Sequence, residues 1–553
     1  MAEKITGSRD DAENIEIQPP GVGDRRGDPQ DMGQDQDGTP RVPSGIPGLD
    51  ELLGGGLPEG RATLISGGAG SGKTLAAIHF TTDGAAEAGQ GAVYVSFEEP
   101  APQLRRTIRS LGRDVEKLEA EGKLAVIDAA PQPSTEQDGG LHDVLPEIVG
   151  GRFELSGLIA RIEAAAQRVN ARRVALDSLA GLAGMFLHDA ASGGNLDFEL
   201  RAPLSRLINA LKLRGYTLLV TAERDEEGGA LTRYGLEEFV ADGVVILRSR
   251  SFGERRRRTV EVRKLRSCAH VEGESPMIIR AGKGITVLPL NMIQLTQESD
   301  PERATSGLGE LDRMTGGGLL RDSVILVSGA SGTGKTLLST HFLTGGVECG
   351  DKSLLLAYEE SQEQLLRNGD AFGLKLRKQV EAGDLIIDCV YPESMSTEAH
   401  LLHIQHQIER HRPNRLVIDS LSALERIGPD FAFRQFLTSM AAMVKRRRVM
   451  TLLTAGGGSF GDQVRISEQH ISTLNDTIIL LRYQEVHGRV ERNLTVLKMR
   501  GSGHAREHRR YRIGDRGIVL SGPRGDQETN VAGERVQPLP PAEDSGAAPP
   551  KQC

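Results

Sequence analysis

Two kinds of hydrophobic pattern alternate along most of this chain. Short apolar runs, such as "ATLIS" (62–66) and "VILVS" (324–328), predict buried strands. Apolar residues at helical spacing over 155–169 and 398–411 predict amphipathic helices. Strands that alternate with helices are typical of βαβ units, which place their strands side by side in a parallel sheet. The pattern therefore predicts an α/β fold, in which mainly parallel twisted sheets are flanked by helices.

The chain also repeats itself once, at a spacing of domain length. A repeat of this size predicts two homologous α/β domains in tandem. The matching pairs are "SGIPGLDELLGGGLPEGRATLISGGAGSGKTLAAIHF" (44–80) with "SGLGELDRMTGGGLLRDSVILVSGASGTGKTLLSTHF" (306–342), "RRVALDSLAGL" (172–182) with "NRLVIDSLSAL" (414–424), and "VRKLRSCAH" (262–270) with "VLKMRGSGH" (496–504).

The repeat sets the expected domain boundaries. We expect a first domain over 41–290 and a second over 304–521, joined by a linker at 291–303. The ends, 1–40 and 522–553, contain few large apolar residues and are predicted to be disordered tails, the first of them acidic.

Composition excludes some classes of protein. No stretch is long and apolar enough to span a membrane, and the N-terminus lacks the apolar region of a signal peptide, so we expect a cytoplasmic protein without a membrane partner. The net charge of −9 over 553 residues makes nucleic acid an unlikely partner, because dedicated nucleic-acid binders usually carry a basic surplus.

Both copies carry a phosphate-binding loop directly after a predicted strand. "GGAGSGKT" (67–74) and "GASGTGKT" (329–336) both match G-x4-G-K-T. In such a loop the backbone N–H groups surround the phosphates, the lysine reaches the β- and γ-phosphate oxygens, and the threonine hydroxyl contacts Mg²⁺. The predicted nucleotide-binding residues are Gly67, Gly70, Ser71, Gly72, Lys73 and Thr74 in the first copy, and Gly329, Gly332, Thr333, Gly334, Lys335 and Thr336 in the second.

A pair of glutamates ends the next apolar run of each copy. Glu98 and Glu99 follow "AVYVSF", and Glu359 and Glu360 follow "LLLAY". A carboxylate at the end of a strand beside the phosphate loop can orient or deprotonate an attacking water or hydroxyl group. A solvated acidic loop is the alternative, but the recurrence of the pair at the same place in both copies favours a catalytic role.

Each copy has a third apolar run that ends in aspartate. Asp177 ends "VALD" and Asp419 ends "LVID". An aspartate in this place holds Mg²⁺ through its water shell in many P-loop nucleotidases, so together with Thr74 and Thr336 these residues are the predicted metal site. Capping at the strand end is the alternative.

Near the end of each copy, two cations flank one apolar residue. Lys264 and Arg266 stand in "KLR", and Lys498 and Arg500 stand in "KMR". On a strand both cations of a pair would face the same side, where they could stabilise γ-phosphate charge. A solvated strand face is the alternative.

Two further patterns could indicate a nucleic-acid contact and a metal site, but each has a simpler interpretation. The run "GERRRRT" (253–259) could grip a nucleic-acid backbone, but its counterpart reads "HGRVERN" and glutamates flank it, so a subunit contact or a solvated hairpin is favoured. The histidines of "HLLHIQHQ" (400–407) have helical spacing, which favours an amphipathic helix over a metal site.

The combination of these motifs resembles the KaiC family of circadian-clock ATPases and autokinases. The resemblance covers about 42–515, and the segments that carry it include "EEFVADGVVILR" (237–248), "KLR", "KMRGSGH" and "HISTLNDTIILL" (470–481). The last of these and the double domain are not shared by RecA-type recombinases in general. It implies two tandem RecA-like domains in a double-ring homohexamer that binds ATP between neighbouring subunits. The basic pairs would then contact the nucleotide of the adjacent subunit.

The resemblance also implies different roles for the two domains. The first would be a slow ATPase whose base is Glu98, supported by Glu99. The second would be an autokinase in which Glu359, beside Glu360, removes the proton of an acceptor hydroxyl. The implied acceptors are Ser472 and Thr473, with Ser467 as a further possibility. The first copy has Glu238 and Phe239 in place of the Ser-Thr pair.

Two departures from the family concern partners. After Val519 the chain lacks an obvious match to the C-terminal segment that KaiA grips, so we expect autophosphorylation without KaiA. The segment 131–156 is longer than usual, near the region where a KaiB-like protein would dock on the first domain.

Two other functions are the alternatives to an ATPase and autokinase. One is a RecA-like DNA-dependent ATPase, and the other is a signalling scaffold in which nucleotide only holds the ring together.

Overall fold

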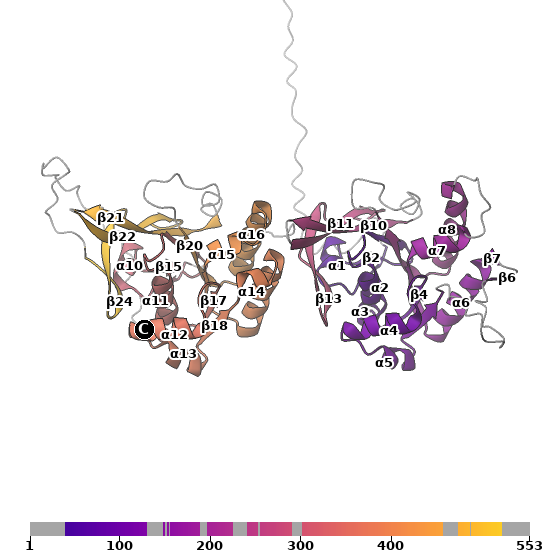
Figure 1. Ribbon diagram of the computed structural model, residues 1–553, viewed down its shortest axis with the longest axis horizontal. Coiled ribbons are helices and arrows are strands. Elements are labelled where there is room, and N and C mark those ends of the chain that lie inside the picture. The colour runs from indigo at the N-terminus through magenta and orange to yellow at the C-terminus, as the bar shows by residue number, and fades with distance from the viewer. Residues whose placement is uncertain are drawn as a thin grey trace, which may run out of the picture.

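The computed structural model describes residues 39–129, 148–149, 152–153, 155–187, 196–224, 241–252, 255–289, 301–456, 474–486 and 488–522. Two sheets of nine strands each are flanked by helices on both faces (Figure 1). The expectation of two tandem α/β domains with mainly parallel sheets is confirmed. No helix in the described ranges is both long and apolar enough to cross a membrane. The predicted tails and linker lie almost wholly outside these ranges.

The first sheet has the strand order β13-β12-β11-β10-β3-β9-β8-β4-β5. The six strands from β10 to β5 are parallel, and β11, β12 and β13 extend the sheet as an antiparallel wing. The strand bounds are β3 Ala62–Gly67, β4 Gly91–Ser96, β5 Leu124–Asp128, β8 Ala171–Asp177, β9 Thr217–Glu223, β10 Gly243–Phe252, β11 Arg255–Leu265, β12 Glu274–Arg280 and β13 Gly284–Val287.

The second sheet repeats this topology in the order β18-β17-β19-β20-β16-β21-β22-β23-β24. Its strands from β18 to β21 are parallel and its last three are antiparallel. The bounds are β16 Val324–Gly329, β17 Ser353–Ala357, β18 Leu385–Cys389, β19 Arg415–Asp419, β20 Met450–Gly456, β21 Thr477–Val486, β22 Arg489–Met499, β23 Arg509–Gly514 and β24 Gly517–Leu520. Short two-stranded ladders complete the described strands: β1 Arg41–Val42 with β2 Leu57–Pro58, β6 Ile148–Val149 with β7 Arg152–Phe153, and β14 Arg303–Ala304 with β15 Leu319–Leu320.

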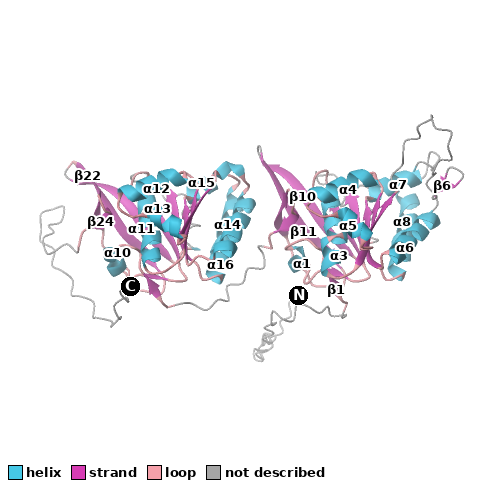
Figure 2. Cartoon of the chain, turned by 90° about the horizontal axis from the view of Figure 1, so that it is seen from below, coloured by secondary structure: helices cyan, strands magenta, loops and turns pink. Residues whose placement is uncertain are grey.

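Helices cover both faces of each sheet, so each domain has two apolar cores, one on either side (Figure 2). The central strands β3 and β16 are buried along their whole length, which explains why their sequences are continuously apolar rather than alternating. The helices are α1 Leu49–Leu52, α2 Lys73–Thr81, α3 Asp83–Glu87, α4 Ala101–Ser110, α5 Val115–Ala120, α6 Leu155–Arg168, α7 Leu179–Leu187, α8 Leu196–Leu213, α10 Gly309–Met314, α11 Lys335–Glu348, α12 Gln362–Ala371, α13 Leu376–Ala382, η3 Pro392–Ser394, α14 Thr397–His411, α15 Leu421–Glu425 and α16 Asp430–Arg446.

The histidine-rich segment forms the predicted amphipathic helix, α14. His400 is fully buried and its Nε2 lies 2.8 Å from the carbonyl oxygen of Pro392, while His403 pairs with Asp388 at 2.6 Å. Among the described residues no group of three or more His, Cys, Asp or Glu side chains could hold a metal ion.

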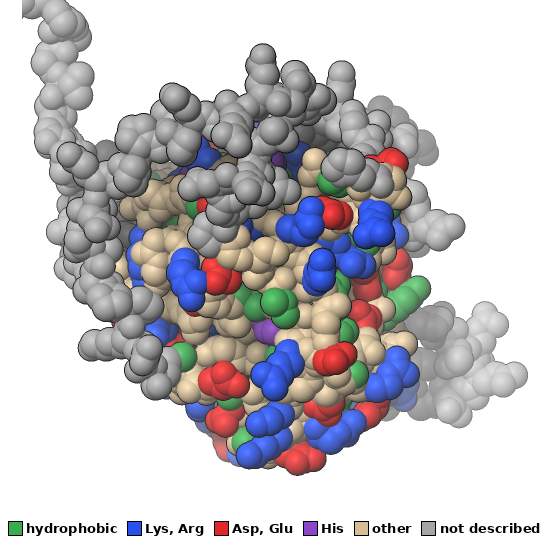
Figure 3. All heavy atoms as spheres, turned by 90° about the vertical axis from the view of Figure 1, so that its left-hand side faces the viewer, with side chains coloured by type: hydrophobic (Ala, Val, Ile, Leu, Met, Phe, Trp, Pro, Cys, Tyr) green, Lys and Arg blue, Asp and Glu red, His purple; other side chains and the backbone are tan. Residues whose placement is uncertain are grey.

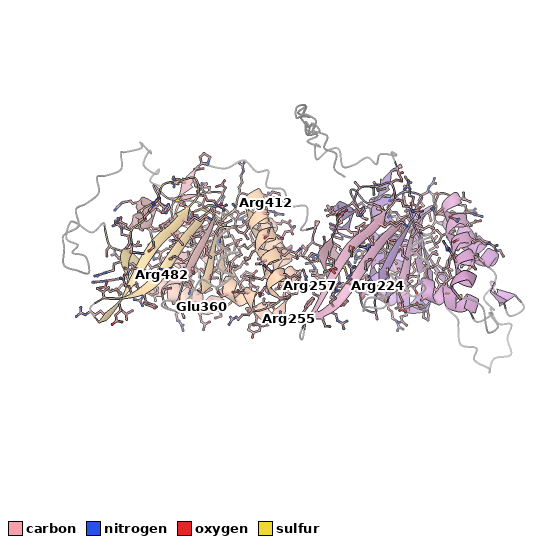
Figure 4. All side chains as sticks on the ribbon, turned by 90° about the horizontal axis from the view of Figure 1, so that it is seen from above. Arg224, Arg255, Arg257, Glu360, Arg412 and Arg482 are labelled. Atoms are coloured by element: carbon pink, nitrogen blue, oxygen red, sulfur yellow. The ribbon has the colours of Figure 1, made fainter. Side chains whose placement is uncertain are left out.

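The four-arginine run opens β11, and alternate side chains of this strand have different partners. Arg257 Nε donates to Glu398 Oε1 of the second domain at 2.7 Å, and its guanidinium lies 4.8 Å from the ring centroid of Phe431. Arg255 donates to the carbonyl oxygen of Met395 at 3.3 Å. Figure 4 shows both arginines between the two domains. Half of the run therefore contacts the second domain of the same chain.

Each domain buries one arginine beneath the helix that follows the phosphate loop. Arg415 is 1% exposed and forms an ion pair with Asp351 at 2.7 Å. Arg173 is also fully buried, but its Nε donates to the amide oxygen of Gln90 at 2.8 Å, and burial lowers its pKa to about 10. The buried arginine thus has a neutral hydrogen-bond partner in the first domain and a charged partner in the second.

Removal of the Asp351 carboxylate should destabilise the second domain. Loss of one partner leaves the other charge buried without compensation, so Asp351→Ala should lower the free energy of unfolding by about 3–5 kcal/mol. Asp351→Gln recreates the arginine–glutamine pair of the first domain, so its free energy of unfolding should fall clearly less. Urea unfolding of the three proteins would measure the difference. Equal losses for both variants would contradict the assigned role of a buried hydrogen-bond acceptor.

His341 of α11 makes the second domain sensitive to acid. It is 7% exposed, its Nε2 accepts a hydrogen bond from Ile518 N–H at 3.1 Å, and burial lowers its pKa to about 4. The folded state therefore favours neutral His341. Because the unfolded pKa is near 6.5, this stabilisation is complete above about pH 6.5 and is lost as the pH falls towards 4.

We therefore expect the second domain to lose about 3 kcal/mol of unfolding free energy from this residue between pH 6.5 and 4. His341→Gln keeps an acceptor but cannot titrate in this range. Its unfolding free energy, measured by urea denaturation at several pH values, should fall less steeply with acid than that of the parent chain. An equal pH dependence of the unfolding free energy in the two proteins would contradict the prediction, because another titrating group would then dominate the acid sensitivity.

Candidate active sites

The parallel sheet brings the candidate residues of each domain to one edge. The phosphate loop follows the carboxyl end of β3 or β16, the glutamate pair follows β4 or β17, and the aspartate ends β8 or β19. Because these strands are parallel, their carboxyl ends lie at the same edge of the sheet, which is where open α/β sheets bind ligands.

The phosphate loops have the backbone conformation that their glycines predict. Gly72 and Gly334 precede α2 and α11 with φ values of 107° and 100°, a region that L side chains rarely adopt. Lys73 Nζ donates to Gly68 O at 3.0 Å, and Lys335 Nζ donates to Gly329 O at 2.8 Å, so each ammonium lies over its own loop. The free N–H groups of the first helical turn and this ammonium form an anion site.

Hydroxyl groups surround the strand-end aspartates, which are buried. Asp177 and Asp419 are each 8% exposed. Thr221 donates to Asp177 Oδ1, and Thr454 occupies the same place beside Asp419. Burial raises the pKa of Asp419, whereas hydrogen bonds from Thr454 and from the loop residue Thr336 act in the opposite direction. The structure thus places Thr336 beside Asp419, as a shared metal site requires.

The two glutamates of each pair have different surroundings. Glu98 and Glu359 are exposed, and each accepts a hydrogen bond from the serine that follows the strand-end aspartate. The distance between Ser420 Oγ and Glu359 Oε1 is 2.8 Å. The second glutamate is half-buried: burial raises the pKa of Glu99, and so do Asp177 and Glu98 nearby. Glu360 behaves similarly beside Asp419 and Glu359. The exposed glutamates are therefore the better placed to meet a substrate.

At each site the loop threonine lies at the same edge of the sheet as the strand-end aspartate, and these oxygen donors fit a divalent cation that is bound partly through water. Burial, together with repulsion from nearby carboxylates, raises the pKa values of Glu99 and Glu360, and Glu99 Oε2 is buried with no hydrogen-bond partner among the described residues. Such a group of hard oxygen donors beside an anion site matches the preference of Mg²⁺ for carboxylates, hydroxyls and phosphates.

The basic pairs lie away from the phosphate loop of their own domain. Lys498 pairs with Ile478 at the start of β21, and this part of β21 lies beside the amino end of β16, whereas the loop follows the carboxyl end of β16. Lys264 has the same position in the first domain. The fold therefore does not bring either basic pair to its own loop.

The expectation that both cations of a pair lie on a strand is wrong for the arginines. β11 ends at Leu265 and β22 at Met499, so Arg266 and Arg500 are the first residues beyond the strands. A register shift interrupts the ladder close to both lysines, between Val244 and Val245 and between Ile478 and Ile479. Such bulges cannot be read from an alternating sequence pattern.

Several polar groups at the sites were not predicted from the sequence. Ser178 and Ser420 contact the exposed glutamates, and Arg258 Nε donates to Gly70 O of the phosphate loop at 3.3 Å. Tyr511 OH donates to the carbonyl oxygen of Thr333 in the second loop. The serines carried a usable signal, since both copies contain Asp-Ser at the end of the strand. The other two contacts depend on strands that are distant in the sequence.

The proposed acceptors Ser472 and Thr473, with Ser467, lie outside the described residues, as do Glu238 and Phe239. The chain is described again from Leu474, and Asn475 O accepts a hydrogen bond from Lys498 Nζ at 2.9 Å. The described residues that follow the Ser-Thr pair are thus next to the basic pair of the same domain.

Comparison with known proteins agrees with this geometry. A family model described as "ATPase: KaiC" matches residues 42–292 and again 304–524. The chain is 44% identical over 490 residues to the circadian clock protein KaiC3 of Synechocystis sp., covering 89% of this chain and 93% of the relative. It is 44% identical over 472 residues to the circadian clock oscillator protein KaiC of Synechococcus elongatus, covering 85% and 87%.

These matches span both domains and most of each relative. Each domain carries the complete phosphate loop, the glutamate pair and the strand-end aspartate at one edge of its sheet. The chain therefore belongs to the KaiC family and is a KaiC-like, ATP-binding timing ATPase and kinase.

Proposed function

We propose that the first domain hydrolyses ATP slowly and that the second phosphorylates Ser472 and Thr473 of the same kind of chain. The observation that carries this division is the contrast between the repeats. Both domains have the loop, the glutamates and the aspartate, but the paired hydroxyls occur only in the second, where the first has Glu238 and Phe239. The first domain has no hydroxyl pair at this place, so water is its proposed phosphate acceptor.

In the second domain Glu359 is the general base. It takes the proton of the Ser472 or Thr473 hydroxyl as the oxygen bonds to the γ-phosphorus, and the bond from that phosphorus to the ADP oxygen breaks. Ser420 orients Glu359 through the 2.8 Å hydrogen bond, and Lys335 stabilises charge on the phosphate oxygens. In the first domain Glu98 takes a proton from water, and Lys73 has the role of Lys335. Glu99 and Glu360 support the bases.

Mg²⁺ is the proposed metal in both sites. When bound with ATP it neutralises charge on the β- and γ-phosphates. Thr74 and Asp177 would hold it in the first domain, and Thr336 and Asp419 in the second. The hydrogen bond of Thr336 to Asp419 beside the second phosphate loop supports this assignment.

The protein is proposed to assemble as a double-ring homohexamer. Lys264 and Arg266 in the first ring, and Lys498 and Arg500 in the second, would contact ATP bound to the neighbouring subunit. Their position at the far end of the central strand from their own loop supports action on another copy. A heterologous contact of this kind forms a ring when the rotation between neighbouring copies closes.

Partners follow from the same family. We propose a KaiB-like protein on the first domain and phosphorylation that does not need KaiA. Nucleic acid is not proposed: Figure 3 shows Lys and Arg side chains interspersed with Asp and Glu on the described part of the face at the β21–β24 end.

Phosphosite mapping by mass spectrometry after incubation with Mg-ATP tests the kinase assignment. Phosphate should appear on Ser472 and Thr473 without KaiA. Glu359→Gln should slow its appearance by about 100-fold or more, because general-base catalysis contributes about 10²–10⁴-fold. Lys335→Ala should abolish it.

The matched variants Glu98→Gln and Lys73→Ala alter the first domain and should leave the phosphosites occupied while they reduce ATP hydrolysis. Hydrolysis by the parent chain without any phosphate on Ser472 or Thr473 would refute the autokinase. Assembly with ATP but neither reaction would favour the scaffold, and stimulation of hydrolysis by single-stranded DNA would favour the RecA-like alternative.

Mixing two defective chains tests whether the basic pair acts between subunits. Lys335→Ala and the double variant Lys498→Ala, Arg500→Ala should each lose phosphorylation alone. A mixed ring places an intact loop beside an intact basic pair at some interfaces, so co-assembled chains should regain part of the phosphorylation. No recovery, with mixed assembly verified by differently tagged chains, would place the pair in its own subunit's site.

A further inference from the structure

The two strand-end aspartates differ in one hydrogen bond. In the first domain Tyr94 OH donates to Asp177 Oδ2 at 2.5 Å, while Thr221 donates to Oδ1. In the second domain Thr454 corresponds to Thr221 and donates to Asp419 Oδ1. It is the only side chain that donates to this carboxylate from the described strands of the sheet. Hydroxyl groups therefore hold both carboxylate oxygens of the first aspartate.

Strand register identifies the residue that replaces the tyrosine. Tyr94 of β4 lies opposite Ala175, two residues before Asp177. Leu355 of β17 lies opposite Val417, two residues before Asp419. Leu355 is therefore the structural counterpart of Tyr94, and it has no hydrogen-bond donor in its side chain.

The tyrosine is built into the core. Tyr94 is 0% exposed and packs among apolar side chains of the α2 side of the sheet. It reaches Asp177 from β4 on one side, and Thr221 reaches it from β9 on the other. Two donors from strands on opposite sides of β8 fix the plane of the carboxylate, because rotation would break one of the bonds. Hydrogen bonds of hydroxyl groups to a carboxylate are short and strong.

We propose that Tyr94 is a positioning residue of the first domain, which holds Asp177 in the orientation that receives the water shell of a divalent cation bound with ATP. This inference rests on the proposed metal role of Asp177. In the second domain the other hydroxyl near Asp419 is that of Thr336. Thr336 is itself a proposed cation ligand, so within the described part of the second domain Asp419 has no second support from the core.

Removal of the hydroxyl should weaken cation binding without loss of packing. Tyr94→Phe keeps the ring and deletes only the donor. Loss of a group that orients a metal-site residue typically costs about 10–100-fold in metal affinity or activity, so we expect the dissociation constant of the cation to rise about tenfold.

Mn²⁺ replaces Mg²⁺ as the probe, because its electron paramagnetic resonance signal reports binding directly. The full-length chain with Lys335→Ala isolates the first-domain site, and binding is measured with a non-hydrolysable ATP analogue. Tyr94→Phe should raise the Mn²⁺ dissociation constant about tenfold. The Mg²⁺ concentration for half-maximal hydrolysis should rise in parallel, while KM for ATP at saturating Mg²⁺ stays unchanged.

A buried tyrosine of the second domain supplies the matched control. Tyr358 is 5% exposed, and its OH has no hydrogen-bond partner among the described residues. In a Lys73→Ala chain, which isolates the second site, Tyr358→Phe should leave the Mn²⁺ affinity unchanged. An equal loss in this control would reduce the effect of Tyr94 to general packing and overturn the proposal.

Asp177→Asn distinguishes a failure of the inference about Tyr94 from a failure of the proposed metal role of Asp177. If it weakens Mn²⁺ binding and Tyr94→Phe does not, the inference about Tyr94 is wrong and the metal role of Asp177 stands. If Asp177→Asn itself leaves the Mn²⁺ affinity unchanged, the proposed metal role fails and the inference fails with it.

Discussion

The parallel pairing of the central strands is the constraint on which both sites depend. The phosphate loop, the glutamate pair and the strand-end aspartate of the first domain are spread over more than 100 residues, from Gly67 to Asp177. They meet because β3, β4 and β8 run in one direction and end at one edge. The same pairing places the aspartate between neighbouring strands, whose hydroxyls compensate the burial of its charge.

Sequence alone could predict the parts of the site that follow from local spacing. Glycines and a lysine at fixed intervals specify the loop, and an acidic residue after an apolar run specifies a strand end. The contacts of Tyr94 with Asp177 and of Arg257 with Glu398 join residues that are 83 and 141 positions apart. Such pairs depend on strand register and domain packing, which cannot be predicted from the hydrophobic periodicity of the sequence. The bulges beside Lys264 and Lys498 were invisible for the same reason.

The repeat shows which polar interactions the fold requires and which it only permits. Both domains bury an arginine beneath the helix after the loop, but its partner is Asp351 in one and Gln90 in the other. Both support the strand-end aspartate with a threonine, but only the first adds a tyrosine. The backbone topology thus tolerates exchange of a charged and a neutral partner, and the Nε of the buried arginine has an acceptor in both domains.

Two differences between the domains, Tyr94 against Leu355 and Glu238-Phe239 against Ser472-Thr473, are at positions where their chemistry would diverge. A domain that transfers phosphate to water needs the loop, the acids, a cation held in one orientation and the neighbouring subunit's basic pair. A domain that transfers phosphate to protein must also receive a segment of chain at the nucleotide. The described residues that follow Thr473 lie beside Lys498, at the end of the central strand remote from the loop. Asn475, which follows the proposed acceptors in the sequence, therefore lies next to the basic pair that we assign to the neighbouring subunit's nucleotide. A single contact between copies would then serve both the acceptors and the basic pair at the same γ-phosphate.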